Sequence, residues 1–402
     1  MRRVVVTGIG VICAAGRTTE EFLQSLREGR SGIARLRAQD EWGLRFSTGG
    51  EVDGYCAADY FAPKDGDMMD RFAQFAVIAA REAVKQSGIE WTQDLLENTA
   101  IVTGSCIGGQ ATEDQGFWDV YKNGKPRVHP MTIPKTMANA GASAVSLEFG
   151  ITGPAFTVAT ACASSAHAIG QAYTMVRSGM ADFAVTGGSE APFSFGLLKA
   201  WEAMRVVSPT ICRPFSKDRN GMILGEGSAM FTIETLEHAQ ARGAKPIAEI
   251  VGFGMSADAH HITQPSAEGA AKAVRMALRD AGIGPEQVGY INSHGTGTTV
   301  NDSTETRALK LVFGEHAGKI TMSSTKAMHG HTLGAAGAIE STAAILALTN
   351  NFIPPTINYS EPDPECDLDC TPNVARAAAF EYAISNSFAF GGLNAVLAFR
   401  KI

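Results

Sequence analysis

Charged residues are scarce in this chain, and there is no excess of positive charge. They make up 19% of the 402 residues, against 45% hydrophobic residues, so much of the chain must be buried. The formal net charge of −7 argues against nucleic acid as the main partner. A chain of this length can hold two core units.

Long apolar runs and paired cysteines are also missing. No stretch approaches the length of a membrane span, and the start MRRVVVTGIG predicts a first strand rather than a signal peptide. The seven cysteines are odd in number and scattered, which argues against disulfides and predicts a reducing, cytoplasmic compartment. Cys366 and Cys370 have no histidine nearby, so we expect solvated loop thiols there rather than metal ligands.

The chain repeats a pattern of helix, apolar strand, strand with a reactive-looking turn, and a further strand. After each reactive turn comes a helix rich in small residues. Alternating helices and strands predict βαβ units, and strands that are apolar throughout predict sheets covered on both faces. The paired segments are 72–88 and 270–282, 99–109 and 288–299, 157–167 and 320–331, and 182–190 and 382–392.

Two such halves, stacked, predict an α/β fold of five layers, αβαβα, with the small-residue helices between two sheets. We place the halves at 1–245 and 246–402, with insertions at 110–150 and 190–225 in the first. No linker separates them, so we expect one compact unit.

Cys162, in the run TACASSAHAIGQA, is the first chemistry-bearing residue. It follows a strand-like segment and opens a helix, so the positive end of the helix dipole and free backbone N–H groups would stabilise its thiolate. This predicts a nucleophile on a strand–turn–helix elbow. A buried structural cysteine is the alternative if the residue is taken by itself.

The second and third motifs supply histidines and a lysine. His294 ends a strand in NSHGTGT, where Thr296 and Thr298 could hydrogen-bond an amide-rich arm, although a structural histidine in a capped loop is equally consistent. In SSTKAMHGHTLGAAG, Lys326 and His331 lie five residues apart and Glu340 could pair with the lysine. We interpret His329 as ordinary loop polarity.

The fourth motif, SFAFGGLN at residues 387–394, places two phenylalanines and two glycines on a turn. It predicts a mobile aromatic lid around Phe390 and Gly391 with free backbone N–H groups. A hydrophobic β-turn would be the simpler interpretation without the other motifs.

Taken together, TACASS, SHGTGT followed by NDSTE, SSTKAMHGHTLGAAGAIE and NSFAFGGLN resemble the β-ketoacyl-[acyl carrier protein] synthases, especially the type II elongating enzymes. The resemblance runs end to end. LLKAWEAMR, SADAHHITQP and EPDPECDLDCTPNVAR are most similar to nodulation ketosynthases, and ketosynthases for polyene products are near relatives. The resemblance implies a thiolase-like fold.

It also implies roles. Cys162 would accept the acyl chain, and His294 and His331 would act on the malonyl unit by stabilising the enolate. The remaining implied roles are electrostatic support by Lys326 with Glu340, a gatekeeper at Phe390, an oxyanion hole from the N–H groups of Cys162 and Phe390, contacts to the phosphopantetheine arm by Thr296 and Thr298, and further substrate contacts by Ile107 and Gly391.

The implied reaction is a decarboxylative Claisen condensation of an acyl thioester with malonyl-acyl carrier protein, without metal or other cofactor. The partners would be an acyl carrier protein and a second subunit, as a homodimer or with a ketosynthase-like chain. A non-catalytic chain-length factor would lack Cys162, and a coenzyme A thiolase would carry a second catalytic cysteine near the C-terminus.

The chain departs from the family pattern at four positions. Ala389 replaces a glycine before the gatekeeper, and its Cβ would restrict a backbone that needs positive φ when the lid swings. Ser293, Gly297 and Leu393 are the other departures. They bear on gating and acyl specificity rather than on the reaction.

Overall fold

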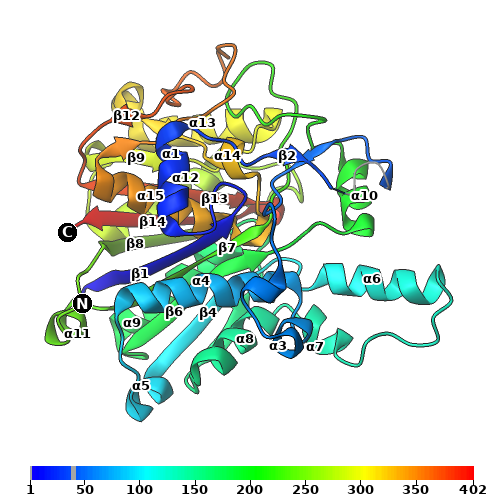
Figure 1. Cartoon of the computed structure of the whole chain (residues 1–402). Helices are drawn as coiled ribbons and strands as arrows, with labels where there is room; N and C mark the ends of the chain where they lie inside the picture. The colour runs from blue at the N-terminus through cyan, green and yellow to red at the C-terminus, as the bar shows by residue number, and fades with distance from the viewer. Residues whose placement is uncertain (1, 38–41) are drawn as a thin grey trace.

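Ten of the described strands join into one mixed sheet, and two further pairs, β2 with β3 and β11 with β12, form small separate sheets (Figure 1). The structure is a computed structural model and describes residues 2–37 and 42–402. Counting outward from the centre, one side runs β1-β7-β6-β4-β5 and the other β8-β14-β13-β9-β10. The strands of the first side are β1 (Val4–Cys13), β4 (Thr99–Gly104), β5 (Ala155–Val158), β6 (Phe183–Glu190) and β7 (Gly227–Thr235). Those of the second are β8 (Ala248–Ala257), β9 (Val288–Asn292), β10 (Met322–Ser323), β13 (Tyr382–Ala389) and β14 (Leu393–Lys401).

The two sides repeat each other in direction as well as in order. The inner strands β1, β7 and β6 pair antiparallel, and β6, β4 and β5 pair parallel. The second side has the same pattern, with β8, β14 and β13 antiparallel and β13, β9 and β10 parallel. The sides meet where Val4–Val6 of β1 pairs antiparallel with Ala248–Ile250 of β8. The predicted repeat is therefore present in the fold.

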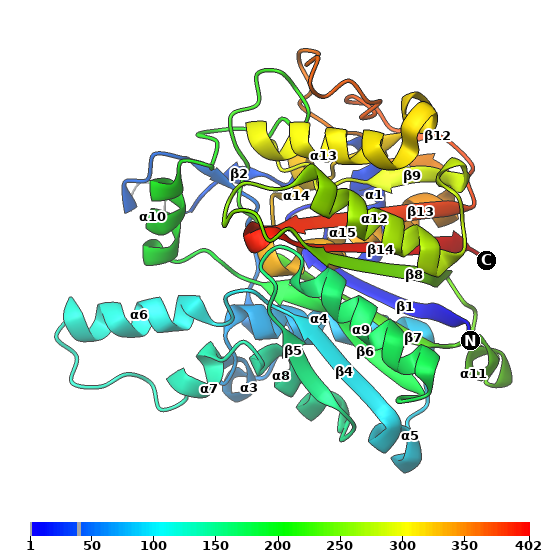
Figure 2. The same cartoon turned by 180° about the vertical axis from the view of Figure 1, so that it is seen from behind.

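Helices cover this sheet in three further layers. Two helices lie between its sides, and two lie outside each side (Figures 1 and 2). The central pair is α9 (Ser164–Ser178) and α15 (Ala336–Asn350), and the outer helices are α4 (Arg71–Ser87), α8 (Ala140–Phe149), α12 (Ala267–Ala281) and α13 (Thr299–Phe313). The arrangement is the thiolase-like αβαβα fold that the sequence predicts.

Small residues in the central helices have a steric reason. A Cβ on Gly337 of α15 would lie 2.8 Å from the backbone nitrogen and the Cβ of Ala166 in α9. The helices therefore approach each other so closely that no larger side chain fits. From Ala336 to Leu348, every residue of α15 is buried, which explains a sequence with no polar face.

Helix ends follow local capping rules. Helix α12 begins after Ser266, whose hydroxyl accepts the N–H of Gly269, and α4 begins after Asp70, whose carboxylate accepts the N–H of Phe72. Both end at a glycine in the left-handed region, Gly282 and Gly88.

The predicted insertions lie on one side of the molecule. Helix α6 (Gln110–Tyr121), the loop after it and α7 (Thr132–Thr136) project from the body, and α10 (Phe195–Met204) lies above them (Figure 1). Helix α8 is part of the outer layer, so the first insertion is shorter than 110–150. The other helices and strands are α1 (Thr19–Glu28), β2 (Ala34–Arg35), β3 (Thr48–Gly49), α3 (Pro63–Asp67), α5 (Gln93–Asn98), α11 (Leu236–Ala241), α14 (Lys326–His329), β11 (Phe352–Ile353) and β12 (Arg376–Ala377).

Two expectations about composition can be compared with the fold. Among the described residues, no helix combines the length and hydropathy needed to cross a membrane. The expectation of solvated thiols at Cys366 and Cys370 is wrong, since both side chains are 2% exposed and pack in the core beneath α12 and α13. The acidic residues around them in the sequence favoured an exposed loop, which led to the wrong prediction.

Candidate active site

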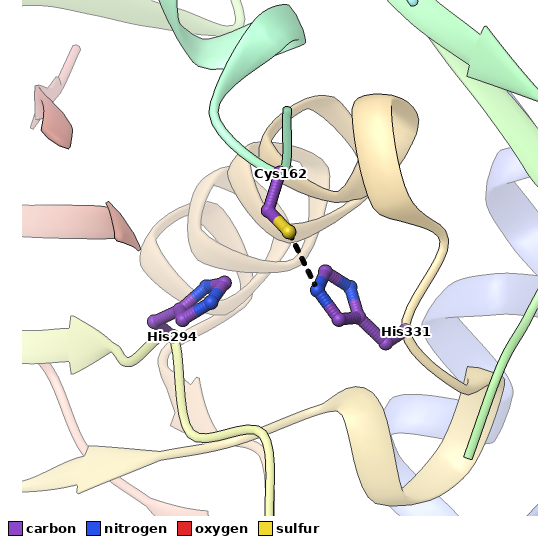
Figure 3. A group of neighbouring side chains, drawn as sticks. All are labelled: Cys162, His294 and His331. Carbon is purple, nitrogen blue, oxygen red and sulfur yellow. Dashed lines mark hydrogen bonds between the residues drawn. The ribbon is translucent and has the colours of Figure 1, made fainter. Parts of the chain in front are cut away.

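A cavity of about 430 Å³ lies where the two halves meet, and its lining includes Cys162, His294 and His331. Figure 3 shows the three side chains converging from separate segments of the chain. Each follows the carboxyl end of a strand, namely β5, β9 and β10. Ligands in α/β sheets bind outside these strand ends, so the topology itself brings the motifs together.

Cys162 lies on a tight turn between β5 and α9. Ala161 before it has φ +49°, a left-handed conformation that costs a non-glycine residue on the order of 1 kcal/mol. The hydroxyl of Ser164 holds the turn by donating to the carbonyl of Ala161 at 2.6 Å and accepting from the N–H of Thr160 at 2.8 Å. Helix α9 begins at Ser164, so Cys162 precedes the helix by two residues rather than lying in its first turn.

The thiol of Cys162 is not a preformed thiolate. Burial raises its pKa to about 11, while the charge of Lys326 and the backbone N–H of Phe390 act in the opposite direction. The expected stabilisation of the thiolate is therefore outweighed by desolvation in the ligand-free protein. The Sγ atom lies 3.1 Å from Nε2 of His331, which is within reach for proton exchange.

His294 has a tautomer fixed by its neighbour. Lys326 Nζ lies 3.3 Å from His294 Nδ1 and 2.5 Å from the His294 carbonyl oxygen. Lysine only donates, so Nδ1 accepts and Nε2 of the neutral ring carries the proton. Burial, the Lys326 charge and the nearby ring of His331 hold the pKa of His294 well below its usual value, so the ring stays neutral. A neutral N–H donor suits a developing oxyanion.

Lys326 itself forms a buried ion pair with Glu340 of α15. The two side chains are 1% and 0% exposed and in direct contact. Burial raises the pKa of Glu340 to about 7, and the lysine opposes that rise. The predicted pairing of the two residues is present. Burial and the Lys326 charge likewise keep the pKa of His331 well below its usual value.

Two buried carboxylates that the sequence analysis did not single out hold the backbone of the site. Glu305 of α13 accepts the N–H groups of His294 and Gly295, each at 2.8 Å. Glu190 at the end of β6 accepts the N–H groups of Cys106 at 2.7 Å and Gly334 at 3.0 Å. Glu305 is the last residue of NDSTE, and its place shortly after the His294 motif was the available signal.

Phe390 and Gly391 belong to a turn, residues 389–392, which we call the gate turn. Gly391 and Gly392 have φ +82° and +70°, values that glycine adopts without strain. The N–H of Gly391 donates to the carbonyl of Ile262 at 2.8 Å. Ala389 has φ −105° and ψ 156°, so its Cβ causes no strain in this conformation. Any effect of Ala389 must arise in another state of the turn.

The predicted arm-binding and acyl-pocket residues lie apart. Thr296 and Thr298 line the cavity, and their hydroxyls are 2.8 Å from each other. Ile107 is outside the cavity lining and packs against an apolar cluster that contains Leu198, and Trp201 packs against the same cluster. The cavity thus reaches the thiol from outside without continuing to Ile107.

The other sequence departures fit their surroundings. Gly297 has φ +77°, and a Cβ there would lie 3.0 Å from the carbonyl oxygen of Gly221. Ser293 donates to the carbonyl of Ser323 at 2.9 Å. His329 is fully buried between Thr325 and the carbonyl of Gly330, so the interpretation as loop polarity is wrong.

Cys162, His294 and His331 form the one group of potential metal ligands found in the described residues, with ligand atoms within 4.8 Å of one another. The donor set is poorly suited to a dication. The hydrogen bond from Lys326 leaves His294 with a protonated Nε2, and a lysine ammonium adjoins the site. Cys366 and Cys370 are not part of such a group.

Comparison with known proteins identifies the family. The model of the β-ketoacyl synthase N-terminal domain matches residues 1–239, and that of the C-terminal domain matches residues 247–360. The chain belongs to the β-ketoacyl synthase family. It is 47% identical to nodulation protein E of Rhizobium sp. (strain N33), over 100% of both chains.

A second relative and a solved structure agree with this assignment. The chain is 41% identical to 3-oxoacyl-[acyl-carrier-protein] synthase 2 of Synechocystis sp. (strain ATCC 27184 / PCC 6803 / Kazusa), covering 100% of this chain and 98% of the relative. The ishigamide ketosynthase/chain length factor structure superposes with a TM-score of 0.94 at 38% identity, covering 100% and 99%. The chain is a ketosynthase whose reaction condenses an acyl group with malonyl-acyl carrier protein. The thiolase and chain-length-factor alternatives are not favoured.

Proposed function

We propose that Cys162 carries the acyl chain and that His294 and His331 act on the malonyl unit. The observation that carries this proposal is the thiol of Cys162 within 3.1 Å of His331 in a cavity that also holds a neutral His294. In the first step, the sulfur attacks the donor thioester carbonyl as its proton leaves. The carrier thiol departs with a proton, and the acyl group stays on sulfur.

In the second step, malonyl-acyl carrier protein enters the same cavity. Its carboxylate leaves as carbon dioxide, and the electron pair of the broken bond forms an enolate whose oxygen accepts the N–H of His294 and a hydrogen bond from His331. The enolate carbon attacks the acyl carbonyl, which is held by the N–H groups of Cys162 and Phe390. The carbon–sulfur bond then breaks, and the Cys162 sulfur takes up a proton from solvent to restore the thiol.

The remaining roles follow from position. Lys326 and Glu340 fix the tautomer of His294, and Thr296 and Thr298 contact the phosphopantetheine arm in the cavity. Ile107 contacts the acyl chain, and Gly391 lets the gate turn move. No metal or redox cofactor takes part. The halves divide at residue 245, where the family models also leave a gap between residues 239 and 247.

Mass spectrometry tests this assignment. We expect the intact wild-type chain to gain one acyl mass from acyl-carrier thioesters, and a panel of chain lengths and unsaturations identifies the fatty or polyene substrate. Loss of the added mass in Cys162→Ala supports the assignment. Acylation of Cys162→Ala at the wild-type rate would contradict it.

We also propose that the enzyme works as a dimer in the cytoplasm. Strand β5 is the edge strand next to β4, and Phe156 on it is 40% exposed. Leu147 of α8, a helix that packs on β5, is 85% exposed. The seven cysteines are free, as in a reducing compartment. A second copy of the chain or a ketosynthase-like subunit would pair with this edge. Native mass spectrometry of the wild type and of Phe156→Asp separates the cases, since a monomeric wild type would contradict the homodimer.

A further inference from the structure

A tryptophan at the mouth of the cavity touches the gate turn. Trp201 lies near the end of α10, and its ring stacks on that of Phe390 with centroids 6.3 Å apart and an interplanar angle of 25°. Both side chains are half-buried and line the cavity that holds Cys162. The position of Phe390 is therefore set partly by a contact from another element.

The same tryptophan also adjoins the apolar cluster beyond the cavity. Trp201, Ile107 and Val206 pack against buried Leu198, Leu224 and their neighbours in this cluster. Trp201 thus belongs both to the cavity wall and to the cluster that contains Ile107. Trp201, stacked on Phe390, therefore lies between the cavity and this apolar cluster.

Trp201 is presented rigidly. Leu198, one turn before Trp201 on α10, is fully buried. Glu202, the residue after Trp201, accepts the backbone N–H of Arg45 at 2.5 Å. Arg205 ends the helix in a left-handed conformation with φ +58°. The gate turn, in contrast, has two glycines with positive φ. Its backbone is held by two hydrogen bonds to one neighbouring loop, from the N–H of Gly391 to the carbonyl of Ile262 at 2.8 Å and from the N–H of Asp258 to the carbonyl of Gly392 at 2.9 Å. Opening therefore moves Phe390 away from a fixed Trp201.

We propose that Trp201 is a positioning residue for Phe390 and thereby sets which acyl chains reach Cys162. This inference rests on the proposed function. A chain attached to the thiol must extend toward the Ile107 cluster, and this requires Phe390 to leave Trp201. A long chain replaces the lost contact by packing against both rings, whereas a short chain leaves them exposed, so the stack disfavours short chains.

The size of the effect follows from the stack. Aromatic pairs of this geometry contribute enough that losing one shifts a two-state turn by about two- to tenfold. Replacing Trp201 by leucine should raise acylation by short chains by this factor and change acylation by long chains less. The ratio of the two rates is the informative quantity, because a general loss of stability would lower both together.

Single-turnover acylation of Cys162, followed by intact mass, tests the proposal with octanoyl- and hexadecanoyl-carrier protein. We expect Trp201→Leu to raise the octanoyl-to-hexadecanoyl ratio about two- to tenfold, and Trp201→Phe, which keeps a ring, to stay near wild type. Trp118→Leu is the matched control, since Trp118 makes an edge contact with Phe195 and none with the gate turn. A wild-type ratio in Trp201→Leu, or an equal shift in Trp118→Leu, would overturn the proposal.

Tryptophan emission gives a second readout if Trp201→Leu folds poorly. Acylation of the wild type should change its emission, and the change should be absent in Trp201→Phe. Equal changes in both proteins would overturn the proposal. If the wild type takes no acyl mass from either donor, the proposed function fails and the gate inference with it. If the wild type is acylated and the ratio does not respond, only the inference fails.

Discussion

The two halves of the ketosynthase place different chemistry on the same scaffold position. The turn between β5 and α9 presents Cys162, and the turn between β10 and α15 presents Lys326 and His331. Each turn contains a non-glycine residue in the left-handed region, Ala161 at φ +49° and Leu333 at φ +47°. Such strain persists where the surrounding structure holds it and is common at functional sites. The fold repeats a geometry, and the sequence places a cysteine in one copy and a lysine and a histidine in the other.

The outer edges of the two sheet halves differ as well. Strand β10 is covered, since Met322 donates its N–H to the carbonyl of Asp369 at 2.9 Å and Thr371 donates its hydroxyl to the Met322 carbonyl at 2.9 Å. Within the described part of the chain, no such hydrogen bonds cover the outer edge of the equivalent β5, and Phe156 on it is 40% exposed. The half with the nucleophile therefore also offers the surface suited to a partner subunit.

Replacing Cys162 should have the largest effect, because it removes the proposed nucleophile from one of the two equivalent turns. We expect Cys162→Ala to lose self-acylation by a factor on the order of 10⁴ or more, as for other covalent nucleophiles. Intact mass after incubation with acyl-carrier donor measures the loss. Cys106→Ala is the control, since it removes a neighbouring thiol outside the cavity lining. A comparable loss in Cys106→Ala would contradict the assignment.

Variants of the two histidines in the second half test whether malonyl decarboxylation depends on that half more than self-acylation does. His294→Ala or His331→Ala should slow malonyl decarboxylation about a hundredfold or more, the cost of one preorganised donor, and affect self-acylation less. Release of carbon dioxide from labelled malonyl-carrier protein measures the first step. His316→Ala, outside the cavity lining, should change neither. Equal losses in both half-reactions would remove the distinction between the halves.

The effect of Lys326 and Glu340, in the second half, on the pKa of Cys162 can be measured through the reactivity of its thiol. Because burial raises the Cys162 pKa to about 11, its alkylation by iodoacetamide should increase about tenfold per pH unit between pH 7 and 9, following the thiolate fraction. The Lys326 charge lowers that pKa and the Glu340 charge raises it by less, so the double variant Lys326→Met/Glu340→Gln should react only a few-fold more slowly at pH 8.

The double variant avoids leaving Glu340 buried without its partner. Lys199→Met, at the surface, is the control for loss of a positive charge. A rate that is flat between pH 7 and 9 would mean that the thiol ionises well below the value its burial implies.

The gate turn should show the smallest effect. Ala389 lies at φ −105°, where alanine is unstrained, so Ala389→Gly matters only if the turn passes through positive φ on opening. The cost of alanine there is on the order of 1 kcal/mol, so acylation by non-cognate chains should rise about fivefold at most. Rapid-quench acylation with cognate and non-cognate donors measures it. Unchanged rates for both would contradict a gating role of Ala389.

Much of this architecture could be predicted from periodicity and motifs. The repeat of helix and apolar strand gave the layers, and the alanine-rich runs after Cys162 and His331 predicted the central helices. The sequence could not show that burial would outweigh the helix dipole at Cys162, because desolvation depends on what packs around the thiol. Nor could it show that Cys366 and Cys370 are buried, since their cover comes from distant helices.

Contacts between distant segments were likewise beyond prediction. The carboxylate of Glu190 holds the backbone of Gly334, which is 144 residues away in the chain, and no sequence pattern around Glu190 indicates this contact. Glu305 holds the backbone of His294, and only its place in NDSTE indicated a role beside that motif. The stack of Trp201 on Phe390 joins residues from different halves. Their motifs were recognised separately, but only the fold places them in contact.

The order of the chain has a consequence for synthesis. The central helix α15 is among the last elements to be made, yet it lies in the middle of the molecule, against α9 and between the sheet halves. Until α15 emerges, the face of α9 that it covers in the folded protein stays exposed. Strand β1 likewise cannot pair with β8 until residues some 240 positions later in the chain have been made. Closing such long loops is slow, and exposed apolar surface favours aggregation. A nascent chain of this enzyme is thus most vulnerable during translation of its second half, and it acquires its catalytic centre only when α15 takes its place.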